Sequence, residues 1–514
     1  MPSLGQLVAR QAHRAPTRDA IVYNGRRITW AGLDSEVNRA AAVFQRRGMV
    51  KGERLAVMST NCDDLVVVLY AAAKLGLLVV PVNPRMAAPE VTWLLEDSGA
   101  TGFVFHPDLT AVADAARAAA SVPPRIHLAL GPLAGRPEPE SLKSLMADAP
   151  NHEPATLVAE SDDAEILYTS GTTGRPKGVL LDHHQVIWAG LNVSLTVGMA
   201  ESERILQVAP LYHSAGLNLF LHGGTAVGAT HVLLDTFDPG VVLDVMESER
   251  ITTFFGVPTM YQMLLDRPDF ASRDLSAWRI GLFGAAPMPP ITIERLHTAA
   301  PGVRLFNLCG PTEAGPGGIG LGPDHIAQRP SANGWPILNT EARVVDSQGR
   351  DVPTGSTGEV ILRGESVMKG YWNNPEATAE ALRDGWLHTG DVARIDADGC
   401  ITLVDRMKDM IITGGMNVYS VEVENALAAH PAVADCAVVG APHPVYGESV
   451  VAVVSPREGC AITLEDLRSH VSALIADYKA PHRLVLGEIP RNPSGKILKH
   501  VLREQVRGET AASS

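Results

Sequence analysis

The chain has few charged residues, few aromatic residues and no excess of basic charge. Charged residues make up 19% of the 514 positions and aromatic residues 5%, and 43 Lys and Arg stand against 57 Asp and Glu, giving a net charge of −14. An acidic chain is repelled by nucleic acid and by anionic membranes, so neither is expected to be the main partner. The overall charge does not exclude a local basic site for a small phosphate ligand.

Paired cysteines are also missing. A disulfide framework or a zinc site needs closely spaced or matched cysteines, and this chain has an odd number without any C-x-x-C pair. We therefore expect reduced thiols and a cytoplasmic location. The five cysteines are Cys62, Cys309, Cys400, Cys436 and Cys460.

No segment has the form of a secretion signal or a membrane span. The best candidate, residues 205–234, contains no Asp, Glu, Lys or Arg, but it is interrupted by Pro210 and four glycines and carries three histidines. A spanning helix needs about 20 mostly apolar residues in a row, so buried strands and a buried helix are predicted there. Residues 1–16 are typical of a short amphipathic helix, and the final Ala-Ala-Ser-Ser is no peroxisomal signal. No integral membrane segment is expected.

What the chain does contain is a regular alternation of short apolar runs and helical patterns. This alternation over the first 400 residues is typical of parallel α/β layers, and the length calls for more than one domain. Residues 55–58 and 78–82 are predicted strands, and Asn61 is predicted to cap a helix over 63–74 between them. Further strands are predicted at 102–105, 253–256, 279–283 and 303–306.

The pattern of predicted elements changes towards the C-terminus. Glycine-rich short strands over 357–403 indicate a small antiparallel sheet or barrel. A charged cluster at 405–409 marks a boundary, and beyond it strands at 433–439 and 450–454 and a helix at 464–475 indicate a small α+β domain.

The stretch from Tyr168 to Gly178 carries the clearest chemistry. Its three glycines allow backbone N–H groups to turn towards an anion, and four hydroxyls and Lys177 add donors that suit a polyphosphate. The spacing is not that of a Walker A loop. An ordinary Gly/Ser/Thr surface loop is the alternative interpretation, and it is disfavoured by the order of all eleven residues.

This stretch resembles the phosphate-binding signature of the adenylate-forming superfamily, which includes acyl-CoA synthetases, adenylation domains of nonribosomal synthetases and firefly-type luciferases. Further segments that resemble the motifs of this family follow in order, and the chain is most similar to an acyl-CoA synthetase. They are Gly284-Ala285-Ala286-Pro287, Gly310-Pro311-Thr312-Glu313, Trp386 to Asp391, Asp405-Arg406 with Lys408, Gly414-Gly415, and Pro493 to Ile497 with Lys496.

The resemblance implies an α/β fold in two parts. An N-terminal domain, residues 1–405, would hold layered parallel α/β subdomains and a small β-barrel-like part, and would bind ATP and the acid. Residues 406–408 would form a hinge centred on Lys408, and residues 409–514 a small mobile α+β domain that carries the catalytic Lys496.

The resemblance also implies roles for single residues. Glu313, with Thr169, would hold Mg²⁺, Gly414 and Gly415 would lie beside the channel for coenzyme A, and the catalytic set would be Lys496, Thr312, Glu313 and His213. ATP and AMP would be bound by Thr169, Ser170, Gly171, Thr172, Thr173, Gly174, Lys177, Gly284, Ala285, Ala286, Pro287, Cys309, Gly310, Thr312, Asp391, Arg406 and Lys496.

These residue types suit the implied chemistry. A carboxylate attacks the α-phosphate of ATP and expels pyrophosphate, and the barrier is mainly repulsion between anions and their alignment. Mg²⁺, the loop amides and Lys496 would offset that charge. A basic tail (Arg491, Lys496, Lys499, Arg503 and Arg507) supports this role. Taken alone, Lys496, Asp391 and Glu313 would each be ordinary surface residues.

Cys309 departs from the family pattern. An aromatic side chain that stacks on adenine usually stands before Gly310, and its loss would weaken ATP binding by about 0.5–1.5 kcal/mol unless another group packs there. Phe283 or a residue near Leu308 is a candidate replacement. A catalytic role for the thiol is disfavoured, because no acid–base partner can be identified.

The implied acyl pocket is apolar, which suits a hydrophobic acid. His213 is either a gate to this pocket or a core histidine bonded to the backbone. No acidic residue lies between Arg204 and Asp235 to pair with an ammonium group, so an amino-acid substrate is disfavoured. The pocket residues are His213, Leu217, Phe255, Val257, Met260 and Gly284.

The sequence therefore predicts an ATP-dependent carboxylic acid–CoA ligase that works through an acyl-adenylate. One rival is a stand-alone ligase that loads a carrier protein, and a rival of another class is a non-catalytic nucleotide-binding regulator. A luciferase-like oxygenase has no sequence feature in its favour. The acid (fatty, aryl or polycyclic) and the oligomeric state (monomer or homodimer) stay open. The expected partners are the acid, ATP and coenzyme A.

Overall fold

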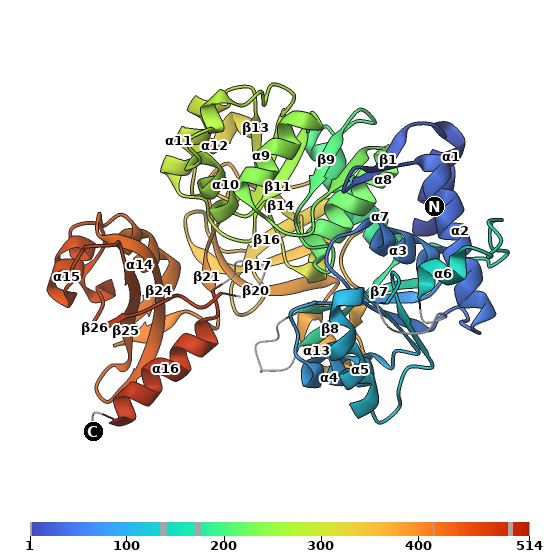
Figure 1. Ribbon diagram of the computed structural model, residues 1–514. Coiled ribbons are helices and arrows are strands. Elements are labelled where there is room, and N and C mark those ends of the chain that lie inside the picture. Colours follow the sequence, from blue (N-terminus) through green and yellow to red (C-terminus); the bar gives the residue numbers. More distant parts are fainter. Residues whose placement is uncertain (1–2, 134–140, 170–175, 415, 492–496, 513–514) are drawn as a thin grey trace. The chain divides into compact units, whose positions relative to one another are not determined.

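A computed structural model describes residues 3–133, 141–169, 176–414, 416–491 and 497–512. Its internal contacts divide the chain into two compact units, Met1–Ala342 with Leu362–Leu387, and Arg343–Ile361 with His388–Ser514. The predicted fold class, an α/β protein with a large N-terminal part and a smaller C-terminal part, is confirmed (Figure 1). The domain boundary predicted at residue 405 stays a prediction.

The first large sheet has the strand order β18-β8-β7-β4-β3-β5-β6. Its inner strands pair in parallel, while β7–β8 and β8–β18 are antiparallel. Its strands are β3 (Arg54–Met58), β4 (Leu78–Val82), β5 (Gly102–Phe105), β6 (Ile126–Ala129), β7 (Asp163–Thr169), β8 (Lys177–Asp182) and β18 (Gly370–Tyr371).

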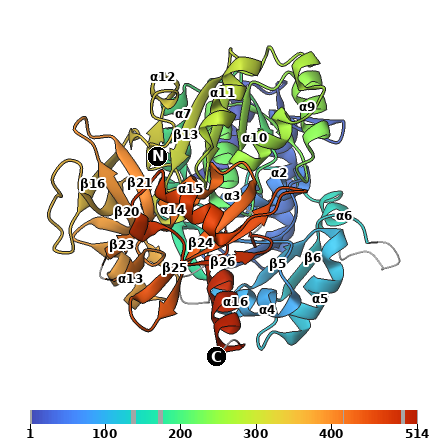
Figure 2. The same ribbon diagram turned by 90° about the vertical axis from the view of Figure 1, so that its left-hand side faces the viewer.

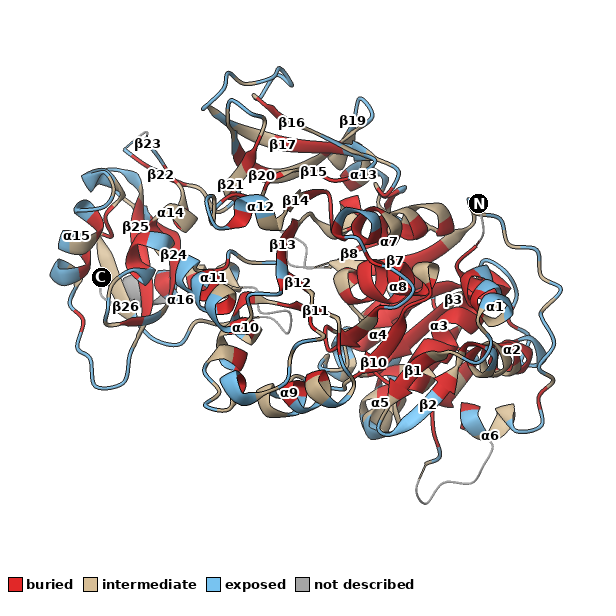
Figure 3. Ribbon diagram, turned by 90° about the horizontal axis from the view of Figure 1, so that it is seen from above, coloured by how far each residue is buried: buried red, intermediate tan, exposed pale blue. Residues whose placement is uncertain are grey.

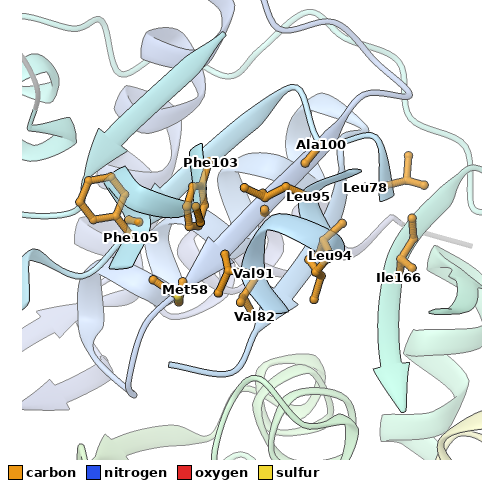
Figure 4. Packing of buried hydrophobic residues seen from close by; sticks show 14 of the residues in the cluster. Met58, Leu78, Val82, Val91, Leu94, Leu95, Ala100, Phe103, Phe105 and Ile166 are labelled. Atoms are coloured by element: carbon orange, nitrogen blue, oxygen red, sulfur yellow. The ribbon is translucent and has the colours of Figure 1, made fainter. Parts of the chain in front are cut away.

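Helices α4 (Ala88–Ser98) and α5 (Thr110–Ala119) cover one face of this sheet. Figure 4 shows how their apolar side chains pack on the strands, with Leu94 and Leu95 of α4 beside Phe103 of β5 and Ile166 of β7. The predicted strands at 78–82 and 102–105 match the observed ones, because each is an apolar run between turn residues.

The second large sheet has the order β15-β14-β13-β12-β11-β9-β10-β1-β2. The strands from β13 to β1 are parallel, and the outer ones are antiparallel. They are β1 (Asp19–Tyr23), β2 (Arg26–Thr29), β9 (Arg204–Gln207), β10 (Thr230–Leu233), β11 (Thr253–Gly256), β12 (Ile280–Gly284), β13 (Arg304–Cys309), β14 (Ile319–Leu321) and β15 (Trp335–Pro336).

Helix α3 (Asp63–Leu75) lies between these two sheets and contacts β4 of the first and β1 of the second. It is buried almost all round, as expected of a helix that is apolar on every face (Figure 3). The predicted cap at Asn61 is wrong. The Cys62 sulfur accepts the hydrogen bond from Leu65 N at the start of α3, and the Asn61 amide instead donates to the carbonyls of Gln207 and Ala209.

The apolar stretch 205–234 is divided among several buried elements, as predicted. After β9 the chain forms a π-helix, η2 (Ala215–His222), which continues into α8 (Gly223–Val227) and β10. Within the residues that the structure describes, no helix combines the length and the hydropathy required to cross a membrane. The amphipathic helix predicted at the N-terminus is α1 (Leu4–Arg14), whose apolar face is buried.

The remaining helices of the first unit surround the sheets (Figures 1 and 3). They are α2 (Trp30–Arg46), η1 (Pro107–Leu109), α6 (Leu142–Met146), α7 (His183–Val197), α9 (Pro239–Ser248), α10 (Pro258–Leu265), η3 (Phe270–Ser272), α11 (Pro290–Ala299), η4 (Thr312–Ala314), α12 (Pro323–Ile326) and α13 (Pro375–Ala381).

A third sheet, order β16-β17-β20-β19 with β21 beside β20, corresponds to the glycine-rich strands expected over 357–403. Its strands are β16 (Thr340–Val345), β17 (Thr357–Gly364), β19 (Leu382–Arg383), β20 (Trp386–Ile395) and β21 (Ile401–Arg406).

The C-terminal part of the second unit is an α+β fold around a fourth sheet, order β23-β22-β25-β24 with β26 beside β25. Helices α14 and α15 pack on one side of it, and Leu502 and Val506 of α16 pack on the other (Figure 2). The elements are β22 (Ile411–Thr413), β23 (Met416–Val418), α14 (Ser420–Ala428), β24 (Val433–His443), β25 (Gly447–Pro456), α15 (Leu464–Ser472), η5 (Asp477–Lys479), β26 (Arg483–Leu486) and α16 (Lys499–Ala512).

Candidate active site

The predicted phosphate loop joins β7 to β8. These strands pair antiparallel up to Thr169 and Lys177, which are register partners at the mouth of the loop. The hairpin therefore brings the hydroxyl-bearing residue and the lysine of the motif to one place. The loop residues Ser170, Gly171, Thr172, Thr173 and Gly174 lie outside the described residues.

A tyrosine that the sequence analysis missed connects the two predicted phosphate motifs. The Tyr371 hydroxyl donates a hydrogen bond of 2.8 Å to Oε1 of Glu313, and the Lys177 ammonium lies 4.9 Å from the centroid of the Tyr371 ring. Strand β18 positions Tyr371 because it pairs with β8 directly after the loop, with Tyr371 opposite Val179. The sequence analysis identified the two motifs, but no feature of the sequence indicated that Tyr371 lies between them.

Thr312 and Glu313 begin the 3₁₀-helix η4, which is separated from the end of β13 by two residues. The Thr312 hydroxyl lies 2.9 Å from the hydroxyl of Ser214, which follows His213 in the predicted acyl segment. The amide of Met368 donates to the carbonyl of Glu313 at 2.8 Å. The structure thus brings the predicted phosphate contact, the predicted metal ligand and the acyl segment together, and Ser214 is a second residue that the sequence analysis missed.

The segment predicted to line the adenine pocket follows the carboxyl end of β12, beside that of β13. Ligands of parallel α/β sheets bind at such ends. A Cβ atom on Gly284 would lie 2.4 Å from the carbonyl oxygen of Leu308, so only glycine allows the two strands to approach this closely. Ala285 has φ of 66°, a left-handed conformation that is rare for alanine and common at functional sites. Ala286 and Pro287 continue this turn.

Cys309 ends β13 and is half-buried. Phe283, the one named candidate for its missing aromatic function, is inside the core with 1% exposed and offers no surface on which adenine could stack. A replacement by a residue near Leu308 stays a prediction. Gly310, next along the chain, lies so close to the backbone of Gly318 that an added Cβ would be 2.7 Å from its nitrogen.

The predicted acyl segments converge in one part of the second sheet. Phe255 lies near the end of β11, and its ring would be 3.8 Å from a Cβ added at Gly284. It stacks on Phe220 of the π-helix with 4.8 Å between ring centroids. Leu217 of the same π-helix is fully buried, whereas Val257 and Met260 are partly exposed.

His213 lies at the entrance to the π-helix. Burial lowers the pKa of its imidazole to about 4, so the ring is neutral at physiological pH. Its Nε2 atom is buried and has no hydrogen-bond partner among the described residues. Within the described part of the chain, His213 is therefore not a core histidine that is bonded to the backbone through its Nε2 atom. By contrast, His222 is an ordinary buried histidine bonded to Tyr70 and Glu165.

The second unit holds the predicted ribose-binding pair. Asp391 of β20 is the register partner of Arg406 of β21, and the Arg406 Nε atom donates to the Asp391 carboxylate at 2.7 Å. The carboxylate is nearly buried, with 11% of the side chain exposed. The sheet thus fixes both groups at one point.

The predicted hinge follows directly. Met407 and Lys408 are exposed, which agrees with a solvated segment, but Asp409 forms an ion pair with Arg503 of α16. Asp405, just before the hinge, accepts two hydrogen bonds from Ser420, one from the amide and one from the hydroxyl. The segment is therefore attached to α14 and α16 in this structure.

Two further predicted positions are only partly described. Gly414 has φ of 57° and donates its N–H to the carbonyl of Tyr446 at 2.9 Å. Gly415 and Lys496 lie outside the described residues.

Three of the five basic residues of the tail form ion pairs. Arg491 pairs with Asp435 at 2.8 Å, Lys499 with Glu424 at 2.8 Å, and Arg503 with Asp409. Their partners lie in β24, in α14 and directly after the predicted hinge. These partners come from elsewhere in the fold, so the local sequence could not reveal them.

Comparison with known proteins identifies the family. Residues 8–372 match the AMP-binding enzyme family, and residues 422–496 match the C-terminal domain of AMP-binding enzymes. The chain belongs to the family of AMP-binding enzymes. The resemblance to adenylate-forming enzymes inferred from the motifs is thereby confirmed.

Several relatives in this family are similar over their full length. A feruloyl-CoA synthase of Amycolatopsis is 40% identical over 98% of this chain and 99% of its own. A long-chain-fatty-acid–CoA ligase of Mycobacterium tuberculosis is 34% identical over 98% and 99%. A fatty acid–[acyl-carrier-protein] ligase of Streptomyces coeruleorubidus is 34% identical over 99% and 98%.

Solved structures agree with these relatives. The anthranilate CoA ligase AuaEII in complex with anthranoyl-AMP superposes with a TM-score of 0.91, at 27% identity over 99% of this chain and 98% of that one. Family members of the same fold thus include one solved with an acyl-adenylate.

Proposed function

We propose that the protein is an AMP-forming carboxylic acid–CoA ligase. The acid attacks the α-phosphate of ATP to give an acyl-adenylate and pyrophosphate, and the thiol of coenzyme A then displaces AMP to give the thioester. The observation that carries the proposal is the arrangement of Lys177, Tyr371 and Glu313, which joins a phosphate loop to a carboxylate suited to a metal ion.

The donor set fits Mg²⁺. This ion is usually held by one or two carboxylates together with substrate phosphates and water, not by a cage of protein ligands. Among the described residues, no group of three or more His, Cys, Asp or Glu side chains could form such a cage. Within the same part of the chain, the Glu313 carboxylate accepts a hydrogen bond from the Tyr371 hydroxyl. Glu313 and Thr169 would hold Mg²⁺, which would supply positive charge against the phosphates.

The chain's own residues would act on both reactants. Lys177 and the loop after Thr169 would bind the phosphates, Asp391 and Arg406 the ribose, and Lys496 would stabilise charge while the adenylate forms. Lys408 would allow the C-terminal part to rotate between the two half-reactions, and Gly414 and Gly415 would border the path of the thiol.

The acyl pocket favours a hydrophobic acid. Its described lining is aliphatic and aromatic, with the neutral imidazole of His213 as its polar group. Because the relative at 40% identity is named a feruloyl-CoA synthase and one at 34% a fatty-acid ligase, aryl-substituted acids come first and fatty acids second.

The test is pyrophosphate release from ATP over a panel of hydroxycinnamic, other aryl, fatty and polycyclic acids, with and without coenzyme A. We expect release with at least one hydrophobic acid and a thioester product when coenzyme A is present. An adenylate that forms but transfers only to a phosphopantetheinylated carrier protein would support the carrier ligase instead. Nucleotide binding without pyrophosphate release for any acid would support the non-catalytic regulator.

A further inference from the structure

Strand β18 connects the two phosphate-binding motifs of the first unit. The amide of Trp372 donates to the carbonyl of Gly178 at 2.7 Å, and the amide of Met368 donates to the carbonyl of Glu313 at 2.8 Å. The hydroxyl of Ser366 also donates to the carbonyl of Ala314 at 2.9 Å. The segment is therefore bonded to the strand that leaves the phosphate loop at one end and to η4 at the other.

Tyr371 uses both parts of its side chain within this connection. Its hydroxyl donates to Oε1 of Glu313, and its ring lies beneath the ammonium of Lys177. A hydrogen bond to one carboxylate oxygen fixes the plane of the carboxylate, so the other oxygen is presented in one direction. The ring face attracts the cation and limits the positions that the long lysine side chain can adopt.

We propose that Tyr371 is a positioning residue for nucleotide binding, which orients the metal-binding carboxylate of Glu313 through its hydroxyl and the phosphate-binding Lys177 through its ring. This inference rests on the proposed function, since both partners take their roles from it. It assigns two separable contributions to one side chain. The hydroxyl acts on the metal ion, and the ring acts on the phosphates whether or not a metal is present.

Two variants separate these contributions. Tyr371→Phe keeps the ring and the β18–β8 pairing but removes the hydroxyl, and Tyr371→Leu removes both. Binding of Mn²⁺ in the presence of ATP is measured by electron paramagnetic resonance, and binding of ATP alone is measured in EDTA. Neither readout requires turnover, and melting curves show whether each variant is folded.

We expect Tyr371→Phe to weaken Mn²⁺ binding about 10- to 100-fold, the usual cost of losing a residue that orients a metal ligand. Its affinity for ATP in EDTA should equal that of the unmodified protein. Tyr371→Leu should also weaken ATP binding in EDTA. In the background of Glu313→Gln, the phenylalanine substitution should have no further effect on Mn²⁺ binding, because the carboxylate through which the hydroxyl is proposed to act is gone.

A matched control is Tyr23→Phe. Tyr23 is another half-buried tyrosine of the first unit, and burial together with the neighbouring Asp235 carboxylate raises the pKa of its hydroxyl. This control should leave Mn²⁺ binding unchanged.

Unchanged Mn²⁺ binding in a folded Tyr371→Phe variant would overturn the proposal. So would a loss of ATP affinity in EDTA as large as the loss in Mn²⁺ affinity, because the hydroxyl would then act on folding or on the nucleotide itself. If the unmodified protein binds Mn²⁺ and ATP but releases no pyrophosphate with any acid, the proposed function fails. The Mn²⁺ comparison still decides the role of Tyr371.

Discussion

The pairing of Asp391 with Arg406 allows a sharp test of nucleotide recognition. If the Asp391 carboxylate accepts hydrogen bonds from the ribose hydroxyls, ATP should bind more tightly than 2′,3′-dideoxy-ATP, which lacks them. A hydrogen bond to a charged group contributes about 1.5–3 kcal/mol. At about 1.4 kcal/mol for each factor of ten, this predicts about 10- to 100-fold discrimination between the two nucleotides.

Asp391→Asn removes the charge with little change of shape. A neutral hydrogen bond contributes about 0.5–1.5 kcal/mol, so the discrimination should fall to about 2- to 10-fold. The change in folding stability should be small, at most about 1 kcal/mol, because the Arg406 side chain is 34% exposed and water replaces much of the lost ion pair. Asp391→Asn should therefore lower the ratio of the affinities for ATP and 2′,3′-dideoxy-ATP while changing the melting temperature only slightly.

The assay is titration calorimetry of both nucleotides with both proteins at one ionic strength. Asp396→Asn is the matched control, since Asp396 pairs with Arg394 at 3.8 Å in the same sheet and both side chains are largely exposed. That control should keep the full discrimination. If Asp391→Asn also discriminates as strongly as the unmodified protein, the assignment of Asp391 to the ribose is refuted.

Four further outcomes are expected. Lys496→Ala should slow ATP–pyrophosphate exchange by about 10²–10³-fold and spare thioester formation from a pre-made adenylate, and equal loss in both assays would contradict its role. Lys408→Pro should slow thioester formation more than adenylation in single-turnover assays, because proline fixes φ in the proposed hinge; equal slowing in a folded variant would refute the hinge. Cys309→Tyr should leave turnover intact or tighten ATP binding, and loss of chemistry in Cys309→Ser with normal ATP binding would instead indicate a catalytic thiol. Burial lowers the pKa of His213 to about 4 and that of His231 to about 3, below the value of about 6.5 expected for unfolded chains, so their stabilisation is complete above pH 6.5 and is lost as pH falls towards these values. A folded His213→Leu variant should accordingly lose less stability between pH 7 and pH 5 in urea unfolding, and an identical loss would show that His213 is not among the groups responsible.

The sequence was sufficient to predict those elements whose sequence pattern is local. The strands at 78–82, 102–105 and 253–256 are short apolar runs bounded by turn residues, and each forms a strand with those bounds. The order of the motifs was also sufficient to identify the family, because each motif is a contiguous segment.

The sequence was insufficient to predict the partner of a side chain that bonds to a distant part of the chain. Asn61 has the chemistry of a helix cap, but the backbone at Gln207 and Ala209 satisfies its amide instead. Tyr371 reaches Glu313 across 58 positions, and Lys499 at the start of α16 pairs with Glu424 of α14, so neither partner could be inferred from local patterns. The pKa of His213 depends on burial, which is likewise a property of the folded chain.

The bonded segment from Ser366 to Trp372 also limits how this chain can change its length. Its two ends are attached to backbone at Ala314 and Gly178, so the number of residues between them cannot vary without breaking one attachment. Successive side chains of a strand point to opposite faces. Inserting or deleting one residue before Tyr371 would therefore place its hydroxyl on the face away from Glu313, although every motif residue would still be present in the sequence. Loops elsewhere on the surface can accept such changes, but this segment cannot.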